Sequence, residues 1–147
     1  MKVSELLKKK GSGVYTIEAH STMSQVLKNM VDNKVGALVV IDSKHSPIGM
    51  ITERDILRIV NKMDMGEWQK TSVGELMTKD IIIGMPDDDV EYIMALMTEN
   101  RFRHVPIIAD GKLAGLISIG DIVKSMLTDI KAENRHLSDY IAGKYPA

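Results

Sequence analysis

Two short segments of the chain repeat one pattern of residue types, and the pattern suits a phosphorylated sugar. Each has a glycine, an isoleucine, a hydroxyl residue and then an aspartate: Gly49, Ile51, Thr52 and Asp55, and later Gly115, Ile117, Ser118 and Asp121. Unpaired N–H groups and the positive dipole end at a helix start attract anions, and a hydroxyl there can bond a phosphate oxygen. The ionised aspartate accepts hydrogen bonds through two oxygens, which suits the vicinal hydroxyls of a ribose.

The same pattern has a simpler interpretation that needs no ligand. A Thr or Ser followed three residues later by an acid resembles a capping box, which starts a helix by itself. A glycine before a strand can also serve a turn. A single copy favours this interpretation, whereas two copies at equivalent strand-to-helix junctions favour binding.

The chain contains an internal repeat. Residues 22–41 align with residues 89–108, and residues 49–56 align with residues 115–122. A unit of this size leaves much of its surface wet, so we expect two units packed as a pseudo-twofold pair. We divide the chain into a first repeat, a linker, a second repeat and a C-terminal helical tail, at residues 1–62, 63–71, 72–128 and 129–147.

The hydrophobic periodicity of each repeat predicts the order β-α-β-β-α, which is an α/β fold with an added C-terminal helix. Expected first strands are residues 14–17 and 81–83, and expected last helices are residues 53–62 and 119–127. In the tail, Ile130, Leu137 and Ile141 share one helical face. That face either contacts a second copy or packs back on the core.

Composition excludes several classes of function. The net charge of −1 lacks the basic excess typical of duplex-binding proteins, so nucleic acid is not favoured. The chain has no cysteine, which excludes disulfides and thiolate metal sites and fits a reducing compartment. Its apolar runs are too short to span a membrane, and we expect a cytoplasmic protein. The histidines lack metal-ligand spacing, and Asp87-Asp-Asp89 suits a helix start, so we expect no metal site.

The repeated segments Gly-Met-Ile-Thr-Glu-Arg-Asp and Gly-Leu-Ile-Ser-Ile-Gly-Asp resemble the signature of a tandem cystathionine-β-synthase (CBS) domain pair, or Bateman module. The resemblance covers roughly residues 1–128 and is closest to stand-alone bacterial pairs. It implies that an adenosine-containing ligand (AMP, ADP, ATP, NAD or S-adenosylmethionine) binds as an effector between the repeats. It also implies that the motif aspartate holds the ribose and that the motif hydroxyl meets phosphate.

The resemblance places two clefts on this sequence. One would use Asp121, Ser118 and Ile117 of the second motif, with the base beside Val35, Gly36 and Ala37, the phosphate near Arg103 and His104, and a rim of Tyr15, Thr16 and His20. The other would use Thr52, Arg54 and Asp55, with Phe102 and Arg103 near the base. Because bulky residues 101–104 replace the smaller residues 34–37, we expect the Asp55 cleft to be narrower and the Asp121 cleft to be better occupied.

These features favour a regulatory or sensor module over an enzyme. No histidine lies inside either motif and no cysteine exists, so no nucleophile with a paired base is evident. Two alternatives remain: a structural or protein-interaction adaptor with vestigial clefts, and a nucleotide-processing enzyme. The resemblance also implies a homodimer of CBS pairs, while a target protein stays unidentified.

Overall fold

The computed structural model describes residues 1–11 and 13–141, with the side chains of 138–141 excepted. This part of the chain is a mixture of helices and strands, which confirms the predicted α/β class. Their order is α1 (Val3–Lys10), β1 (Thr16–Glu18), α2 (Met23–Asn33), β2 (Ala37–Ile41), β3 (Pro47–Thr52), α3 (Glu53–Lys62), the 3₁₀ turn η1 (Trp68–Lys70), α4 (Val73–Leu76), α5 (Val90–Asn100), β4 (His104–Ala109), β5 (Lys112–Ser118) and α6 (Ile119–Ile141).

The first repeat is built on a three-stranded sheet. Strand β1 runs parallel to β2, and β2 runs antiparallel to β3. Every residue of β2 is buried, which explains its unbroken apolar sequence. The linker also contributes to this core, because Trp68 packs with Met23, Val26 and Leu38. Residues 63–71 therefore do more than connect the repeats.

The second repeat has a two-stranded antiparallel sheet, β4 and β5, and lacks the first strand that the sequence predicts at residues 81–83. In that segment only Gly84 pairs with β4. Gly84 N donates to Pro106 O and Gly84 O accepts from Ile108 N, and both hydrogen bonds are 2.9 Å long. A Cβ built on Gly84 would lie 2.7 Å from Ile93 Cδ1, so the close approach needs glycine. The three isoleucines before it have no strand partner. Ile81 and Ile82 line the cavity between the repeats instead, and Ile83 is exposed.

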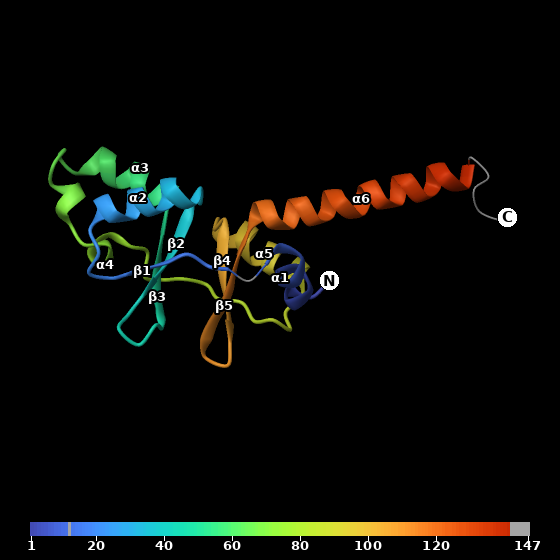
Figure 1. Cartoon of the computed structure of the whole chain (residues 1–147), viewed down its shortest axis with the longest axis horizontal. Coiled ribbons are helices and arrows are strands. Elements are labelled where there is room, and N and C mark those ends of the chain that lie inside the picture. Colours follow the sequence, from blue (N-terminus) through green and yellow to red (C-terminus); the bar gives the residue numbers. More distant parts are fainter. Residues whose placement is uncertain (12, 142–147) are drawn as a thin grey trace.

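The two repeats exchange their first helices. Helix α1 belongs to the first repeat in sequence, yet Val3, Leu6 and Leu7 lie in the core of the second repeat. In return, Val73 of α4 lies in the core of the first. Figure 1 shows α1 beside α5 on one side of the molecule, and α4 with α2 and α3 on the other. The exchange ties the repeats into one body.

Helix α6 continues from the second motif into the tail without a break. Ile122, near its start, is buried against the second repeat. Farther along, the helix projects away from both repeats (Figure 1). Ile130 and Leu137 are about half exposed, so the tail does not pack back on the core. Ile141 lies outside the residues whose side chains are described. Within the described residues, no helix combines the length and the apolar character needed to cross a membrane.

Candidate functional site

Each motif sits where a strand passes directly into a helix. Thr52 ends β3 and precedes α3, and its hydroxyl accepts a hydrogen bond from Asp55 N at 3.4 Å. Asp55 Oδ2 in turn accepts from Thr52 N at 2.9 Å and from the Thr52 hydroxyl at 3.1 Å. The capping box is therefore formed, and it directs the aspartate back toward the end of the strand.

The second motif has the same geometry. Asp121 N donates to Ser118 Oγ at 3.0 Å, and Ser118 N donates to Asp121 Oδ2 at 2.8 Å. Capping uses only Oδ2 of each aspartate for these bonds. The other oxygen, Oδ1, stays available for a second role, and in Asp55 it accepts from the Thr78 hydroxyl at 3.2 Å.

A cavity of about 830 Å³ lies between the repeats. Its walls come from the first motif and α3, from the entrance to β4, and from the end of β5. The lining residues are Gly36, Met50, Thr52, Glu53, Arg54, Asp55, Leu57, Arg58, Thr78, Ile81, Ile82, Asn100, Arg101, Phe102, Arg103, His104, Ser118, Ile119 and Gly120. This size falls within the range of small-molecule sites.

The charge of the cavity lining favours an anionic ligand. It holds four arginines, Arg54, Arg58, Arg101 and Arg103, against two carboxylates. Arginine binds phosphate through paired N–H donors in a fixed plane. His104 adds a polar group and no charge, because burial, followed by the charge of Lys10, lowers its pKa below the usual 6.5. It can exchange hydrogen bonds with a ligand in its neutral form.

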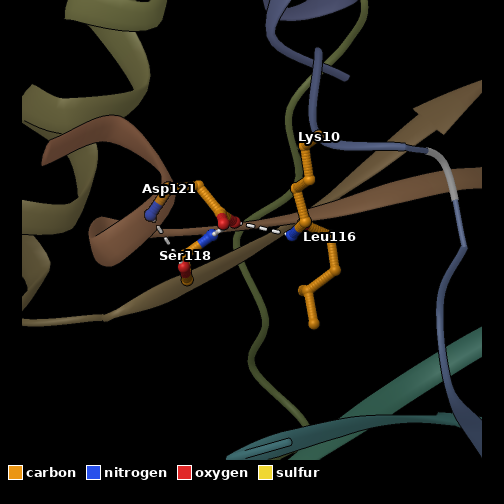
Figure 2. Close-up of polar contacts among 4 residues, drawn as sticks. All are labelled: Lys10, Leu116, Ser118 and Asp121. Atoms are coloured by element: carbon orange, nitrogen blue, oxygen red, sulfur yellow. Dashed lines mark hydrogen bonds and ion pairs between the residues drawn. The ribbon is translucent and has the colours of Figure 1, made fainter. Parts of the chain in front are cut away.

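The carboxylate of Asp121 is already engaged by a cation that the sequence did not lead us to expect. Lys10 Nζ donates to Asp121 Oδ2 at 2.6 Å and also donates to the carbonyl oxygen of Leu116 (Figure 2). Burial alone would raise the pKa of Asp121, but the hydrogen bond from Lys10, the amide of Ser118 and the Lys10 charge outweigh it. The pKa of Asp121 is therefore lowered.

The cavity brings together residues that the sequence assigned to different clefts. All five residues predicted for the Asp55 cleft line it: Thr52, Arg54, Asp55, Phe102 and Arg103. Gly36, His104 and Ser118, predicted for the Asp121 cleft, line the same cavity. Residues 101–104, which the sequence expects to narrow the Asp55 cleft, form part of the wall of this cavity.

The remaining predicted residues lie elsewhere. Val35, Ala37, Ile117 and Asp121 are absent from the cavity lining, and so are the expected rim residues Tyr15, Thr16 and His20. Ile117 and Ala37 are buried. His20 Nε2 lies 3.0 Å from Glu18 Oε2 at the surface. Over Gly36, where a base was expected, a Cβ would lie 2.5 Å from Glu53 Oε1, so a flexible carboxylate occupies that space.

Sequence reasoning missed Lys10 and Thr78 because both reach their aspartates through the helix exchange. Lys10 ends α1, and Thr78 follows shortly after α4. The signal was present: residues 3–7 echo residues 73–77, and each segment packs on the other repeat. Segments that follow an exchanged helix are the natural places to look for residues that reach the opposite motif.

Comparison with known proteins now gives the family. The CBS domain model matches residues 3–62 and 73–128. The chain belongs to the CBS domain family. A mitochondrial CBS domain-containing protein of Arabidopsis thaliana, CBSX3, is 34% identical, over 97% of this chain and 73% of its own length. The CBS-domain protein ATU1752 of Agrobacterium tumefaciens is similar in structure, with a TM-score of 0.82, 35% identity and coverage of 86% of this chain and 99% of the other.

More distant CBS proteins share the fold and have been seen with ligands. PAE2072 of Pyrobaculum aerophilum, in complex with AMP, has a TM-score of 0.75 and 24% identity, over 90% of this chain and 99% of its own. The CBS pair of MJ0100, in complex with 5′-methylthioadenosine and S-adenosyl-L-methionine, has a TM-score of 0.77 and 19% identity, over 88% of this chain and 98% of its own. At these identities the likeness establishes the fold.

Proposed function

We propose that this CBS pair is a regulatory module that binds an adenosine-containing ligand between its repeats. The observation that carries the proposal is the cavity of about 830 Å³, which joins the first motif to a wall of arginines. The complexes of related folds with AMP and with S-adenosyl-L-methionine support the ligand class. The choice among AMP, ADP, ATP, NAD and S-adenosylmethionine is left to the binding experiment.

The cavity suggests how such a ligand would be held. Asp55 Oδ1 faces a single hydroxyl donor, Thr78, and no Lys or Arg of the described chain forms an ion pair with Asp55. That carboxylate can accept ribose hydroxyls by exchanging one neutral donor for another. Arg101 and Arg103 supply the positive charge that a phosphate requires, and Phe102 between them offers a ring for stacking against the base.

A thermal unfolding panel with AMP, ADP, ATP, NAD and S-adenosylmethionine tests this proposal. A ligand that binds only the native state raises the unfolding temperature, and the shift grows with ligand concentration. We expect at least one of these compounds to raise it in the wild type, with a smaller shift in Asp55→Asn. If none of them changes the unfolding temperature at saturating concentration, the proposal is wrong.

A second function, a structural adaptor with a vestigial Asp121 cleft, is favoured by two observations. Both capping boxes are complete, and Lys10 already neutralises Asp121. In that case the motifs would serve only to start helices. The same panel separates the two functions, because an adaptor without an open cleft gains no stability from any nucleotide.

Regulation demands more than binding. A ligand shifts an equilibrium only through different affinities for two states, so the sensor function requires a conformation or assembly that the ligand favours. The homodimer of CBS pairs and the cytoplasmic location stay predictions. The enzyme alternative predicts turnover, so ATP incubated with the protein should stay intact if the module is purely regulatory.

A further inference from the structure

Lys10 reaches Asp121 from a fixed support. It is the last residue of α1, whose Val3, Leu6 and Leu7 are buried in the core of the second repeat. Lys2 Nζ also pairs with Asp89 Oδ1 at 3.0 Å at the other end of the helix. Because the helix is held at both ends, the Lys10 ammonium is presented at Asp121 rather than left to sample the solvent.

Lys10 bonds Oδ2 of Asp121, the oxygen that also caps α6, and the capping bonds leave Oδ1 available. A ribose diol that engages both oxygens of this carboxylate would therefore meet the ammonium at Oδ2. The Lys10 and Asp121 side chains are 29% and 23% exposed, so the pair is partly withdrawn from water. A ribose diol would donate hydrogen bonds to the carboxylate that Lys10 now occupies (Figure 2). Removing Lys10 would also leave the Leu116 carbonyl without this donor. Among the described residues no lysine or arginine forms an ion pair with Asp55, so the two motifs differ in what a ligand must displace.

We propose that Lys10 is a built-in competitor for the Asp121 motif, which makes the Asp55 side the first to fill. This rests on the proposed function, since it assumes that the motif aspartates hold a ribose. A partly exposed ion pair contributes little more than about 1 kcal/mol, so removing Lys10 should tighten binding at Asp121 about three- to tenfold. A ribose bound to both oxygens of Asp121 then requires the Lys10 side chain to move off Oδ2.

Calorimetric titration with AMP tests the competitor. Lys10→Met keeps the aliphatic stem and removes the charge, and Lys9→Met on the same helix is the matched control. In an Asp55→Asn background, Lys10→Met should raise AMP affinity, whereas Lys9→Met should not. In an Asp121→Asn background, Lys10→Met should change nothing, which shows that the effect acts through Asp121.

The possible failures are distinguishable. If AMP binds the wild type and Lys10→Met leaves the affinity for AMP unchanged or lowers it, the proposal that Lys10 competes with the ligand is wrong. The proposed binding function would still stand. If AMP binds neither the wild type nor Lys10→Met, the titration is repeated with the ligand that the thermal panel identifies. If that panel identifies none, the proposed function fails and the competitor fails with it. Thermal unfolding of the unliganded variants checks that each is folded.

A second, independent observation concerns the projecting part of α6. Val123, Leu127, Ile130, Asn134 and Leu137 follow one another at alternating spacings of four and three residues. This is the spacing of a coiled-coil seam, with Leu127 and Asn134 at a positions and Val123, Ile130 and Leu137 at d positions. All five residues are exposed in the single chain, so nothing in the described part of the protein covers the seam.

Asn134 and the flanking charges favour a parallel pair of identical helices. A single asparagine at an a position meets its equivalent in a parallel, in-register dimer, where the two amides can bond each other. An antiparallel pair centred on the seam would set Asn134 against Ile130. It would also place Lys131 of one copy beside Lys131 of the other and Glu133 beside Glu133, which repels.

We propose that the seam binds a second copy of this chain as a parallel two-stranded coiled coil. Because the chain has no cysteine, single introduced cysteines report the geometry directly. Ile130→Cys should form a disulfide-linked dimer with oxidised glutathione as oxidant, while Ala132→Cys on the opposite face should not. Leu137→Lys should shift the protein toward monomer in light scattering without lowering its helix content.

Three outcomes would overturn the coiled coil. One is a monomer at every concentration tested. Another is a dimer that Leu137→Lys leaves intact, which would assign dimerisation to a different surface. The third is crosslinking of Leu127→Cys only with Leu137→Cys and not of Ile130→Cys with itself, because that pattern identifies an antiparallel pair.

Discussion

Leu7 packs so closely on Gly115 that a Cβ at position 115 would lie 2.6 Å from Leu7 Cδ2. The first repeat shows the same close packing, since a Cβ on Gly49 would lie 2.5 Å from Met77 Sδ. Leu7 and Met77 are equivalent in the repeat, and Leu7 lies in α1 while Met77 directly follows α4. The motif glycine therefore has a packing role: it makes room for the helix that the other repeat supplies.

We predict that Gly115→Ala destabilises the protein by about 1–3 kcal/mol, because the added methyl overpacks a site closed by Leu7. The free energy of unfolding in urea measures this. Gly13→Ala is the matched control, since a Cβ there meets nothing within 4 Å. Adding Leu7→Ala should recover part of the loss as a non-additive term. Equal stability of Gly115→Ala and Gly13→Ala would contradict the prediction.

The sequence predicts the repeat, the motif junctions and most element positions because each rests on local pattern. Thr52 and Ser118 begin their helices where the capping signal places them. The prediction of a strand at residues 81–83 was wrong. Three β-branched residues form a strand only if they pair with a neighbouring strand, and in this segment only Gly84 pairs with β4. The sequence could not predict which repeat α1 packs against, because the apolar face of the helix fits the core of either repeat equally well.

The residue types of the candidate site could be predicted from the sequence, but the side chains that contact the motif residues could be predicted less well. Thr52, Asp55 and Arg103 line one cavity, and the motif alone nominates two of them. The Lys10 contact depends on where α1 docks and on a flexible side chain. The echo between residues 3–7 and 73–77 shows that the two segments are equivalent but does not fix the conformation of Lys10. The position of Glu53 beside Gly36 could not be predicted either, because the rotamer of Glu53 depends on the tertiary structure.

Asp55→Asn should weaken AMP binding about tenfold. The amide keeps one acceptor oxygen but loses the charge, and a hydrogen bond to a charged group is stronger than a neutral one by about 1–1.5 kcal/mol. Calorimetry gives the affinity, and the unfolding temperature without ligand corrects for damage to the capping box. Asp32→Asn, at an exposed carboxylate of α2 outside the cavity, serves as control. An affinity equal to that of the wild type would remove Asp55 from the site.

Arg103→Ala should lower AMP affinity about tenfold and leave adenosine affinity nearly unchanged, because only AMP carries the phosphate that the guanidinium would bind. The ratio of the two affinities is the measurement, since a general disturbance of the cavity lowers both. Arg135→Ala removes the same charge from the exposed part of α6 and controls for net charge. Equal losses for AMP and adenosine would mean that Arg103 shapes the cavity without contacting phosphate.

The low pKa of His104 predicts a loss of stability as the pH falls below neutrality. Burial is the main cause, Lys10 and Arg103 act in the same direction, and Asp121 and Glu53 oppose them. Because the folded pKa lies below the unfolded one, the unfolded state binds the proton first. The stabilisation is present above the unfolded pKa of about 6.5 and is lost as the pH falls through the folded value.

Wild-type unfolding free energy should therefore decline as the pH falls below about 7, and the unfolding free energy of His104→Gln should decline less steeply because glutamine cannot titrate. Urea unfolding at several pH values measures the two slopes. His45→Asn is the control: His45 is exposed with a φ of 62°, a conformation that asparagine tolerates. Its slope should match the wild type. A His104→Gln slope as steep as that of the wild type would place the proton uptake on another group.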